Sequence, residues 1–195
     1  MRDVVTIAPL SAEPSVHDAT LALIASELGD GYVTLENIRA YAAHDEDRGG
    51  AIAFVDGEVI GVALGGPATR RTSAAARALG VTQSEPAAEV QTVVVERGRR
   101  HRGVAGALLV PVLSELAASG FASVLAVVWL SGQDESTDLF RSAGFKHLGD
   151  SPRHWWQDSI DRGYDCPSCG NPCQCTAAIW ALDEPADDLD DGAPR

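Results

Sequence analysis

The chain has 195 residues, of which 45% are hydrophobic and 22% are charged, a composition typical of a soluble single-domain enzyme. Its formal net charge of -13 argues against non-specific nucleic-acid binding, which requires clustered lysine and arginine. No apolar run approaches the roughly 20 residues needed to cross a bilayer, and the first residues do not resemble a secretion signal, so we expect a cytoplasmic protein without a membrane segment.

The N-terminal half predicts a strand, two helices and a β-hairpin, followed by a third helix. Asp56-Gly57 is a typical hairpin turn because it accommodates positive φ angles. The predicted elements are a strand at 4–9, helices at 15–28 and 35–43, hairpin strands at 51–55 and 59–64, and an inserted helix at 69–79.

The C-terminal half alternates strands with helices. Its central apolar run has the length of a strand and predicts burial on both faces. The predicted elements are a strand at 88–95, a helix at 104–119, a strand at 123–130, a helix at 134–143, a strand that starts at Phe145, and a strand at 176–182.

This order predicts an α/β (α+β) fold, in which helices flank a mixed, mostly antiparallel central sheet with one parallel crossover. We expect a single domain at 1–183 with a cysteine-rich insertion at 151–175. Residues 184–195 carry acidic side chains against one arginine, so we expect a disordered tail there.

An arginine-rich segment joins the strand at 88–95 to the next helix. Backbone N–H groups at the start of a helix bind anions, and small residues at Gly103 and Ala105 would let a phosphate group approach the main chain. The segment therefore predicts a phosphate-binding turn. The alternative is that Gly103 is only a turn residue in a solvated basic loop.

Two motifs in this half resemble the GNAT superfamily of N-acetyltransferases. Arg100-x-x-Gly103-x-Ala105 matches the Q/R-x-x-G-x-G/A signature of that family, and the segment at 139–145 is similar to its L-Y-x-x-x-G-F segment. The resemblance extends over roughly 4–182 and implies the GNAT fold with acetyl-CoA as co-substrate.

The resemblance also implies which residues bind acetyl-CoA. The main chain of one strand would pair with the pantetheine arm, and the turn after it would bind the pyrophosphate, so the N–H groups matter more than the side chains. The pantetheine residues are Val93, Val94 and Val95; the pyrophosphate residues are Arg100, His101, Arg102, Gly103, Val104 and Ala105; Phe140 of the second motif is grouped with them as a cofactor-binding residue.

Transfer to an amine needs a base, because an ammonium group has no lone pair for attack. Glu89 lies 11 residues before Arg100, the spacing of the base in histone-acetyltransferase-type members of the family, and burial would raise its pKa. The alternative is an exposed glutamate at the start of a strand. Gln91 would share its face and help to orient a water or the substrate.

The second motif departs from the family at one position. Phe140 stands where a tyrosine often protonates the departing CoA thiolate, so Ser136 or a water would replace it. We expect an enzyme that transfers an acetyl group to a primary amine by direct attack. The alternative is a non-catalytic acyl-CoA-binding module with a zinc-stabilised interaction surface.

All four cysteines lie within ten residues, with the spacing C-x2-C-x3-C-x-C: Cys166, Cys169, Cys173 and Cys175. In a reducing compartment such a cluster favours a tetrahedral zinc site. An iron-sulfur cluster, a redox-active disulfide and free thiols are the alternatives.

The four cysteines form the end of an insertion that starts at Ser151. A bound metal would stabilise the fold of this segment, which we expect to have too few apolar residues for a hydrophobic core of its own. The insertion could also wall the substrate site. We expect His154 not to be a ligand, and Trp155 and Trp156 to pack on the sheet; direct contact of the two tryptophans with substrate is the alternative. We expect the acceptor to be a small-molecule or peptide amine, which the sequence does not identify. The sequence leaves both a monomer and a homodimer open.

Overall fold

The computed structural model describes residues 4–80, 85–130 and 136–183. The predicted acidic tail at 184–195 and the first residues of the predicted helix at 134–143 lie outside these ranges. The strands are β1 (Thr6–Pro9), β2 (Gly49–Val55), β3 (Glu58–Pro67), β4 (Ala87–Val95), β5 (Ser123–Leu130), β6 (Lys146–Ser151) and β7 (Thr176–Asp183).

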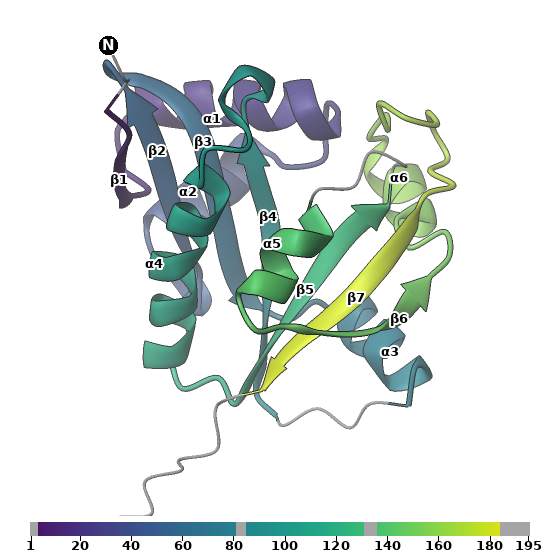
Figure 1. Ribbon diagram of the computed structural model, residues 1–195. Coiled ribbons are helices and arrows are strands. Elements are labelled where there is room, and N and C mark those ends of the chain that lie inside the picture. Colours follow the sequence, from purple (N-terminus) through teal and green to yellow (C-terminus); the bar gives the residue numbers. More distant parts are fainter. Residues whose placement is uncertain (1–3, 81–84, 131–135, 184–195) are drawn as a thin grey trace, which may run out of the picture.

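The strands form one sheet in the order β1-β2-β3-β4-β5-β7-β6 (Figure 1). Only β4 and β5 pair in parallel, and every other neighbouring pair is antiparallel. The predicted mixed, mostly antiparallel sheet with one parallel crossover is therefore confirmed. The predicted hairpin is confirmed as well, since Asp56 and Gly57 both have positive φ angles between β2 and β3.

Helices cover both faces of the sheet. They are α1 (Pro14–Leu28), α2 (Leu35–Ala42), α3 (Arg70–Ala78), α4 (Val104–Ala118), α5 (Ser136–Ser142) and α6 (Trp156–Arg162), with short 3-10 helices η1 (Asp45–Asp47) and η2 (Arg97–Arg99). The helix α6 was not predicted: it is short, and its N-cap residue Trp155 makes no capping hydrogen bond. Within the described residues, no helix combines the length and apolarity required to span a membrane.

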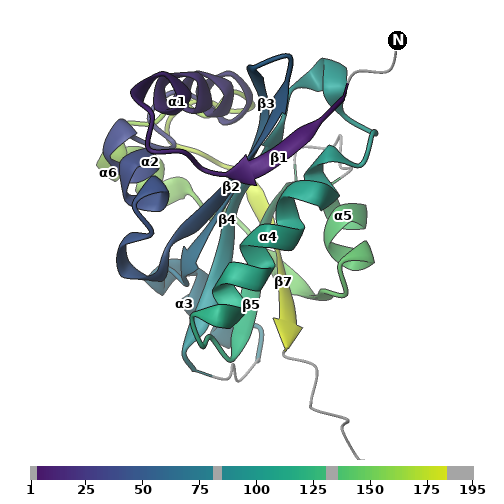
Figure 2. The ribbon, with the colours of Figure 1, turned by 90° about the vertical axis from the view of Figure 1, so that its left-hand side faces the viewer.

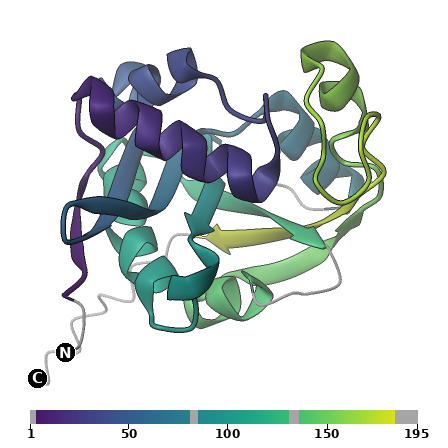
Figure 3. The same cartoon turned by 90° about the horizontal axis from the view of Figure 1, so that it is seen from above.

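Two helical layers enclose the sheet (Figures 2 and 3). On one face, Leu108 of α4 and Phe140 of α5 pack against the strand side chains that point to that face and form one hydrophobic core with them. On the opposite face α1 and α2 contribute Ile24 and Ile38, and α3 packs near β5 and β7. The cysteine-rich insertion lies on this second face.

Small residues let α4 lie close to the sheet. A Cβ atom at Gly65 of β3 would lie 2.7 Å from Val112 Cγ1 and 3.0 Å from Leu116 Cδ1, closer than ordinary packing allows. This close approach fixes the position of α4 and therefore of its N-terminus.

An extra residue in β4 determines where the sheet opens. Leu64 of β3 pairs with Thr92, whereas the next residue, Gly65, pairs with Val90, so Gln91 is a β-bulge. The parallel pairing of β4 with β5 ends at Val90, although β5 continues to pair with β7 along its whole length. Beyond Gln91 the two strands separate, and Figure 1 shows β4 and β5 diverging.

Candidate functional site

The space between the diverging ends of β4 and β5 is part of a cavity of about 580 Å³. Main chain and side chains of 90–95 and 127–129 line it from the two strands. The cavity extends to both faces of the sheet, because its other lining residues come from α4 and α5 on one face and from the cysteine-rich insertion on the other.

At the α4 end the cavity is lined by the start of that helix. Gly103 is the N-cap residue and has φ 79°, a left-handed conformation that favours glycine. The first N–H groups of a helix, here those of 104–106, have no partner within the helix, and these residues line the cavity. No atom lies within 4 Å of a Cβ built at Gly103. The arrangement could therefore accept an anion on main-chain N–H groups, and we refer to it below as the anion site.

Two of the arginines beside this site are held by one carboxylate. Arg100 Nη2 lies 2.7 Å from Glu27 Oε2, and Arg97 Nε lies 3.4 Å from the same oxygen. Arg100 Nε also donates to the carbonyl of Val95 at 3.0 Å. The Arg100 side chain therefore ties the turn to the end of β4 and to α1, whereas the first N–H groups of α4 have no partner within the helix.

Glu89 lies on β4 and is buried, with 5% of its surface exposed, so the alternative of an exposed glutamate is wrong. Its Oε2 accepts a hydrogen bond from the Thr69 N–H at 3.0 Å. Burial raises the pKa of the Glu89 carboxyl, and the hydrogen bonds from Thr69 and Thr72 and the charge of Arg71 offset part of that rise. Within β4, the residues that line the cavity begin one position later, at Val90.

Gln91, two residues after Glu89 on β4, accepts hydrogen bonds from two tyrosines that the sequence did not indicate. The Tyr32 hydroxyl donates to the Gln91 carbonyl at 3.3 Å, and the Tyr41 hydroxyl donates to Gln91 Oε1. Burial, and then the charge of Glu89, raise the pKa of Tyr32 to about 12, so this hydroxyl stays protonated. These contacts join residues 59 and 50 positions apart, and no local pattern indicates them.

Phe140 of α5 lines the cavity and is 4% exposed. Its ring packs edge to face on Phe145, with the ring centres 5.3 Å apart. It offers no proton, but Ser136 at the start of the same helix also lines the cavity.

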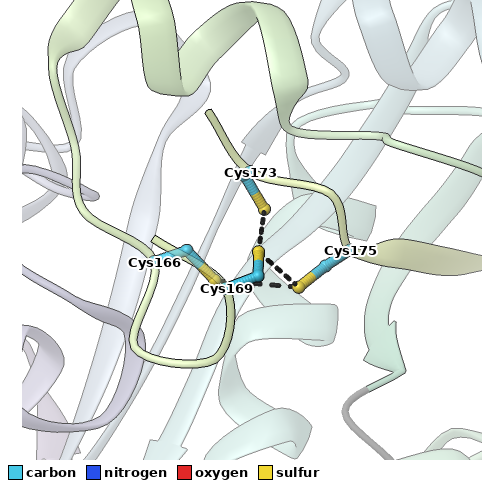
Figure 4. Close-up of side chains that lie close together, drawn as sticks. All are labelled: Cys166, Cys169, Cys173 and Cys175. Carbon is cyan, nitrogen blue, oxygen red and sulfur yellow. Dashed lines mark hydrogen bonds between the residues drawn. The ribbon is translucent and has the colours of Figure 1, made fainter. Parts of the chain in front are cut away.

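The four cysteines come together between α6 and β7 (Figure 4). All four Sγ atoms lie within 4.8 Å of one another, with separations of 3.7 Å for Cys166 and Cys175, 3.8 Å for Cys169 and Cys173, and 3.4 Å for Cys169 and Cys175. Tetrahedral zinc with bonds of about 2.3 Å requires sulfurs about 3.8 Å apart. The donor set and its spacing therefore fit a tetrahedral thiolate metal site.

Main-chain contacts support the cluster. The Gly170 N–H donates to the Cys166 carbonyl at 2.8 Å, which closes the first turn, and the Gln174 N–H donates to Cys169 Sγ at 3.1 Å. Desolvation raises the pKa of the Cys169 thiol, but the Gln174 N–H and the neighbouring thiols outweigh it, so the net shift is downward. N–H donation to sulfur of this kind favours the thiolate form that binds metal.

The cluster also lies at the cavity. Cys166 and the two residues after it line the wall, as do Trp155 and Tyr164. His154 is buried and accordingly packs in the core: its ring contacts Trp155, and in the described part of the chain it is not in the group of possible metal ligands. Trp155 packs in the core as predicted, whereas Trp156 is 37% exposed.

Comparison with known proteins identifies one family. A model of the acetyltransferase (GNAT) family matches residues 18–145. Comparison with curated protein sequences finds no significant match.

Solved structures resemble the chain over nearly its full length. An N-acetyltransferase from Staphylococcus aureus Mu50 has a TM-score of 0.63 at 18% identity, covering 92% of this chain and 98% of that one. A ribosomal-protein-alanine N-acetyltransferase from Brucella melitensis has 0.59 at 17% identity, covering 92% and 99%. A GCN5-related N-acetyltransferase from Kribbella flavida has 0.61 at 18% identity, covering 92% and 97%. At these identities the likeness shows the shared fold.

The burial of Glu89 predicts a pH-dependent cost to folding. Because its pKa in the folded chain lies above the ordinary value of 4.5, stability should fall as the pH rises from about 4.5 through the folded-state pKa. We expect Glu89→Gln, which keeps an acceptor for Thr69, to unfold at a higher temperature than the parent chain at pH 8 and to lose this advantage near pH 4. Thermal unfolding followed by circular dichroism at both pH values measures it.

The matched control is Glu58→Gln, which alters an exposed glutamate of the hairpin. It should not change the pH dependence. A Glu89→Gln protein that is less stable than the parent chain at pH 8 would contradict a raised pKa.

Proposed function

The chain belongs to the GNAT acetyltransferase family, and we propose that it transfers the acetyl group of acetyl-CoA to a primary amine by direct attack. One observation carries the proposal: the anion site at the start of α4 opens into the gap between β4 and β5. A molecule with a diphosphate at one end and an extended arm leading to a reactive group fits both parts at once.

In this proposal, the pyrophosphate of CoA accepts hydrogen bonds from the main chain between Arg100 and Ala105, at the positive end of the α4 dipole. The pantetheine arm lies along the main chain of 93–95, where β4 no longer pairs with β5. Phe140 packs against the cofactor from α5. The thioester then lies at the closed end of the gap, near Gln91.

Glu89 acts as the general base. It takes a proton from the incoming ammonium through a water held beside Gln91 and the Tyr32 hydroxyl, since the carboxylate itself lies just behind the cavity wall. The amine nitrogen attacks the thioester carbon, and the Val93 N–H or a neighbouring one donates to the oxyanion. The C–S bond breaks, the nitrogen loses its second proton to solvent as the amide forms, and the CoA thiolate takes up a proton from solvent, either directly or relayed through the Ser136 hydroxyl.

The cysteine cluster binds zinc as a structural site. Cys166, Cys169, Cys173 and Cys175 supply four thiolates, which leave no coordination position for substrate. A bound metal would tie together the two ends of the cysteine segment, where Cys166 and Cys173 already pack in the cluster that contains Trp155 and Tyr164. Reduced thiols in this number suit a reducing compartment such as the cytoplasm.

The first prediction from this function concerns CoA binding. Valine at Gly103 adds a β-branched side chain at a positive φ angle and fills the anion site, so we expect Gly103→Val to weaken CoA binding by about tenfold or more. Calorimetry with CoA and acetyl-CoA measures the change. Gly98→Ala is the control, because this glycine of η2 has open space at its Cβ position; equal affinities in the two variants would contradict the proposed site.

The second prediction concerns the base. We expect Glu89→Gln to lower kcat by about 10²- to 10⁴-fold while the affinity for CoA stays the same. In the parent enzyme kcat/KM should rise with pH up to the raised pKa of Glu89, and this limb should be absent from the variant. The assay follows CoA thiol release over a pH series with a panel of amines.

Exposed Glu58→Gln serves as the control here as well. Undiminished turnover by Glu89→Gln would assign the base to another group. Tight CoA binding by the parent chain, without turnover on any amine, would instead favour a non-catalytic acyl-CoA-binding module.

The third prediction concerns the metal. Elemental analysis of untagged protein should find about one zinc per chain, and Cys169→Ser should lose most of it while Ser168→Ala retains it. Chelation should lower the unfolding temperature, because metal bound only by the folded chain stabilises it. Iron with visible absorption, or no metal at all, would refute a zinc site.

A further inference from the structure

The cavity end opposite the anion site is enclosed by aromatic rings. Tyr32, Trp129, Trp155 and Tyr164 all line the cavity and come from three parts of the chain: the loop after α1, the end of β5 and the insertion around α6. Each belongs to, or packs against, the hydrophobic cluster on the sheet face away from α4. We call these four residues, together with Cys166, the aromatic pocket.

The polar atoms of Tyr32 and Trp129 face groups of the protein. The Tyr32 hydroxyl donates to the Gln91 carbonyl, and its ring meets Tyr164 edge to face, with ring centres 5.7 Å apart. The buried Trp129 indole N–H has no hydrogen-bond partner of normal geometry in the described chain, but it faces the sulfur of Cys175. The pocket therefore offers a ligand mainly ring surface.

The two ends of the cavity differ in charge. The basic side chains of the described lining all come from 97–101, beside the anion site. The aromatic pocket offers ring faces, which carry partial negative charge, and it borders a cysteine cluster that would have a net negative charge with zinc bound. This end therefore suits a cationic ligand with a flat apolar body.

The cysteine cluster forms one wall of the pocket. Cys166, Pro167 and Ser168 line the cavity directly, and Cys175 lies at the indole N–H of Trp129. The sulfurs of Cys166 and Cys175 are 3.7 Å apart, so a metal bound to both would tie the two contacts together (Figure 4). Metal at this site would hold the wall in place.

We propose that the aromatic pocket is the acceptor subsite, and that it binds a small primary amine carried by a short chain on an aromatic ring. The metal-bound cysteine cluster forms one wall of this subsite and holds its aromatic residues in position. The inference rests on the proposed acetyl transfer, which supplies the co-substrate at the other end of the cavity. The ring of the acceptor packs among Trp129, Trp155 and Tyr164, and its amine reaches the thioester near Gln91.

The first experiment compares amines on the parent enzyme at saturating acetyl-CoA. Phenethylamine and tryptamine should have KM values at least tenfold below those of hexylamine, spermidine and an alanine-terminated peptide. Hexylamine is the matched apolar amine without a ring. A lower KM for spermidine or for the peptide would overturn the assignment of an aromatic amine.

The second experiment alters the pocket. Trp129→Leu should raise the KM for phenethylamine about fivefold to thirtyfold, the range of lost ring contacts, with a smaller change in kcat and an unchanged Kd for CoA. Trp156→Leu changes an exposed tryptophan outside the cavity lining and should alter none of the three. Where Trp129→Leu fails to fold, Trp129→Phe keeps one aromatic ring but loses the N–H donor and the second ring of the indole; the KM for phenethylamine should then rise by no more than about twofold to fivefold, and a KM equal to that for hexylamine would overturn the assignment.

The third experiment removes the metal from folded protein. Chelation should raise the KM for phenethylamine at least fivefold while the Kd for CoA stays constant, and returning zinc should reverse the change. Tryptophan fluorescence provides a readout independent of turnover: zinc titration into the stripped protein should shift the parent signal, and the shift should be much smaller in Trp129→Phe.

Failure of this inference is distinguishable from failure of acetyl transfer. Protein that binds no CoA, or never turns over, refutes the proposed function and the acceptor subsite with it. Protein that binds CoA and acetylates amines, but shows the same KM for phenethylamine with and without metal and in Trp129→Leu, keeps the function and loses the aromatic pocket as its acceptor subsite.

Discussion

The end of hydrogen bonding between β4 and β5 is the constraint on which the site depends. One extra residue, Gln91, shifts the register of β4, and the parallel pairing stops there. Main-chain groups freed from a ladder must find other partners, because unpaired buried groups are costly. The opening is thus a ready place for an extended ligand, and it connects the two faces of the sheet without any hole through the packed core.

The rest of the molecule holds this opening at fixed width. On one face the glycines of β3 let α4 approach closely, which sets the anion site at one edge of the opening. On the other face Tyr32, from the loop between α1 and α2, and Tyr41 of α2 support the bulge through hydrogen bonds to Gln91. Glu89 lies among these contacts, so its burial follows from the same packing that shapes the cavity.

Local patterns in the sequence predicted the sheet, the helix after the arginine-rich turn and the cysteine cluster. The hairpin at Asp56-Gly57 and the ten-residue cysteine segment succeed because their partners are close in sequence. Tyr32 and Tyr41 were missed because their partner Gln91 is more than 40 residues away. The β-bulge at Gln91 was not predicted for the same reason, because a register shift depends on how two strands pair and not on the sequence of one of them.

The cysteine-rich insertion begins and ends on paired residues. Ser151 of β6 lies opposite Ala177 of β7, so the segment between them leaves and re-enters the sheet at a single point. A closed excursion of this kind can lengthen, shorten or be exchanged without altering strand order or the α4 side of the cleft. Changes confined to this segment can therefore reshape the cavity wall on one face of the sheet while leaving the start of α4 on the other face untouched.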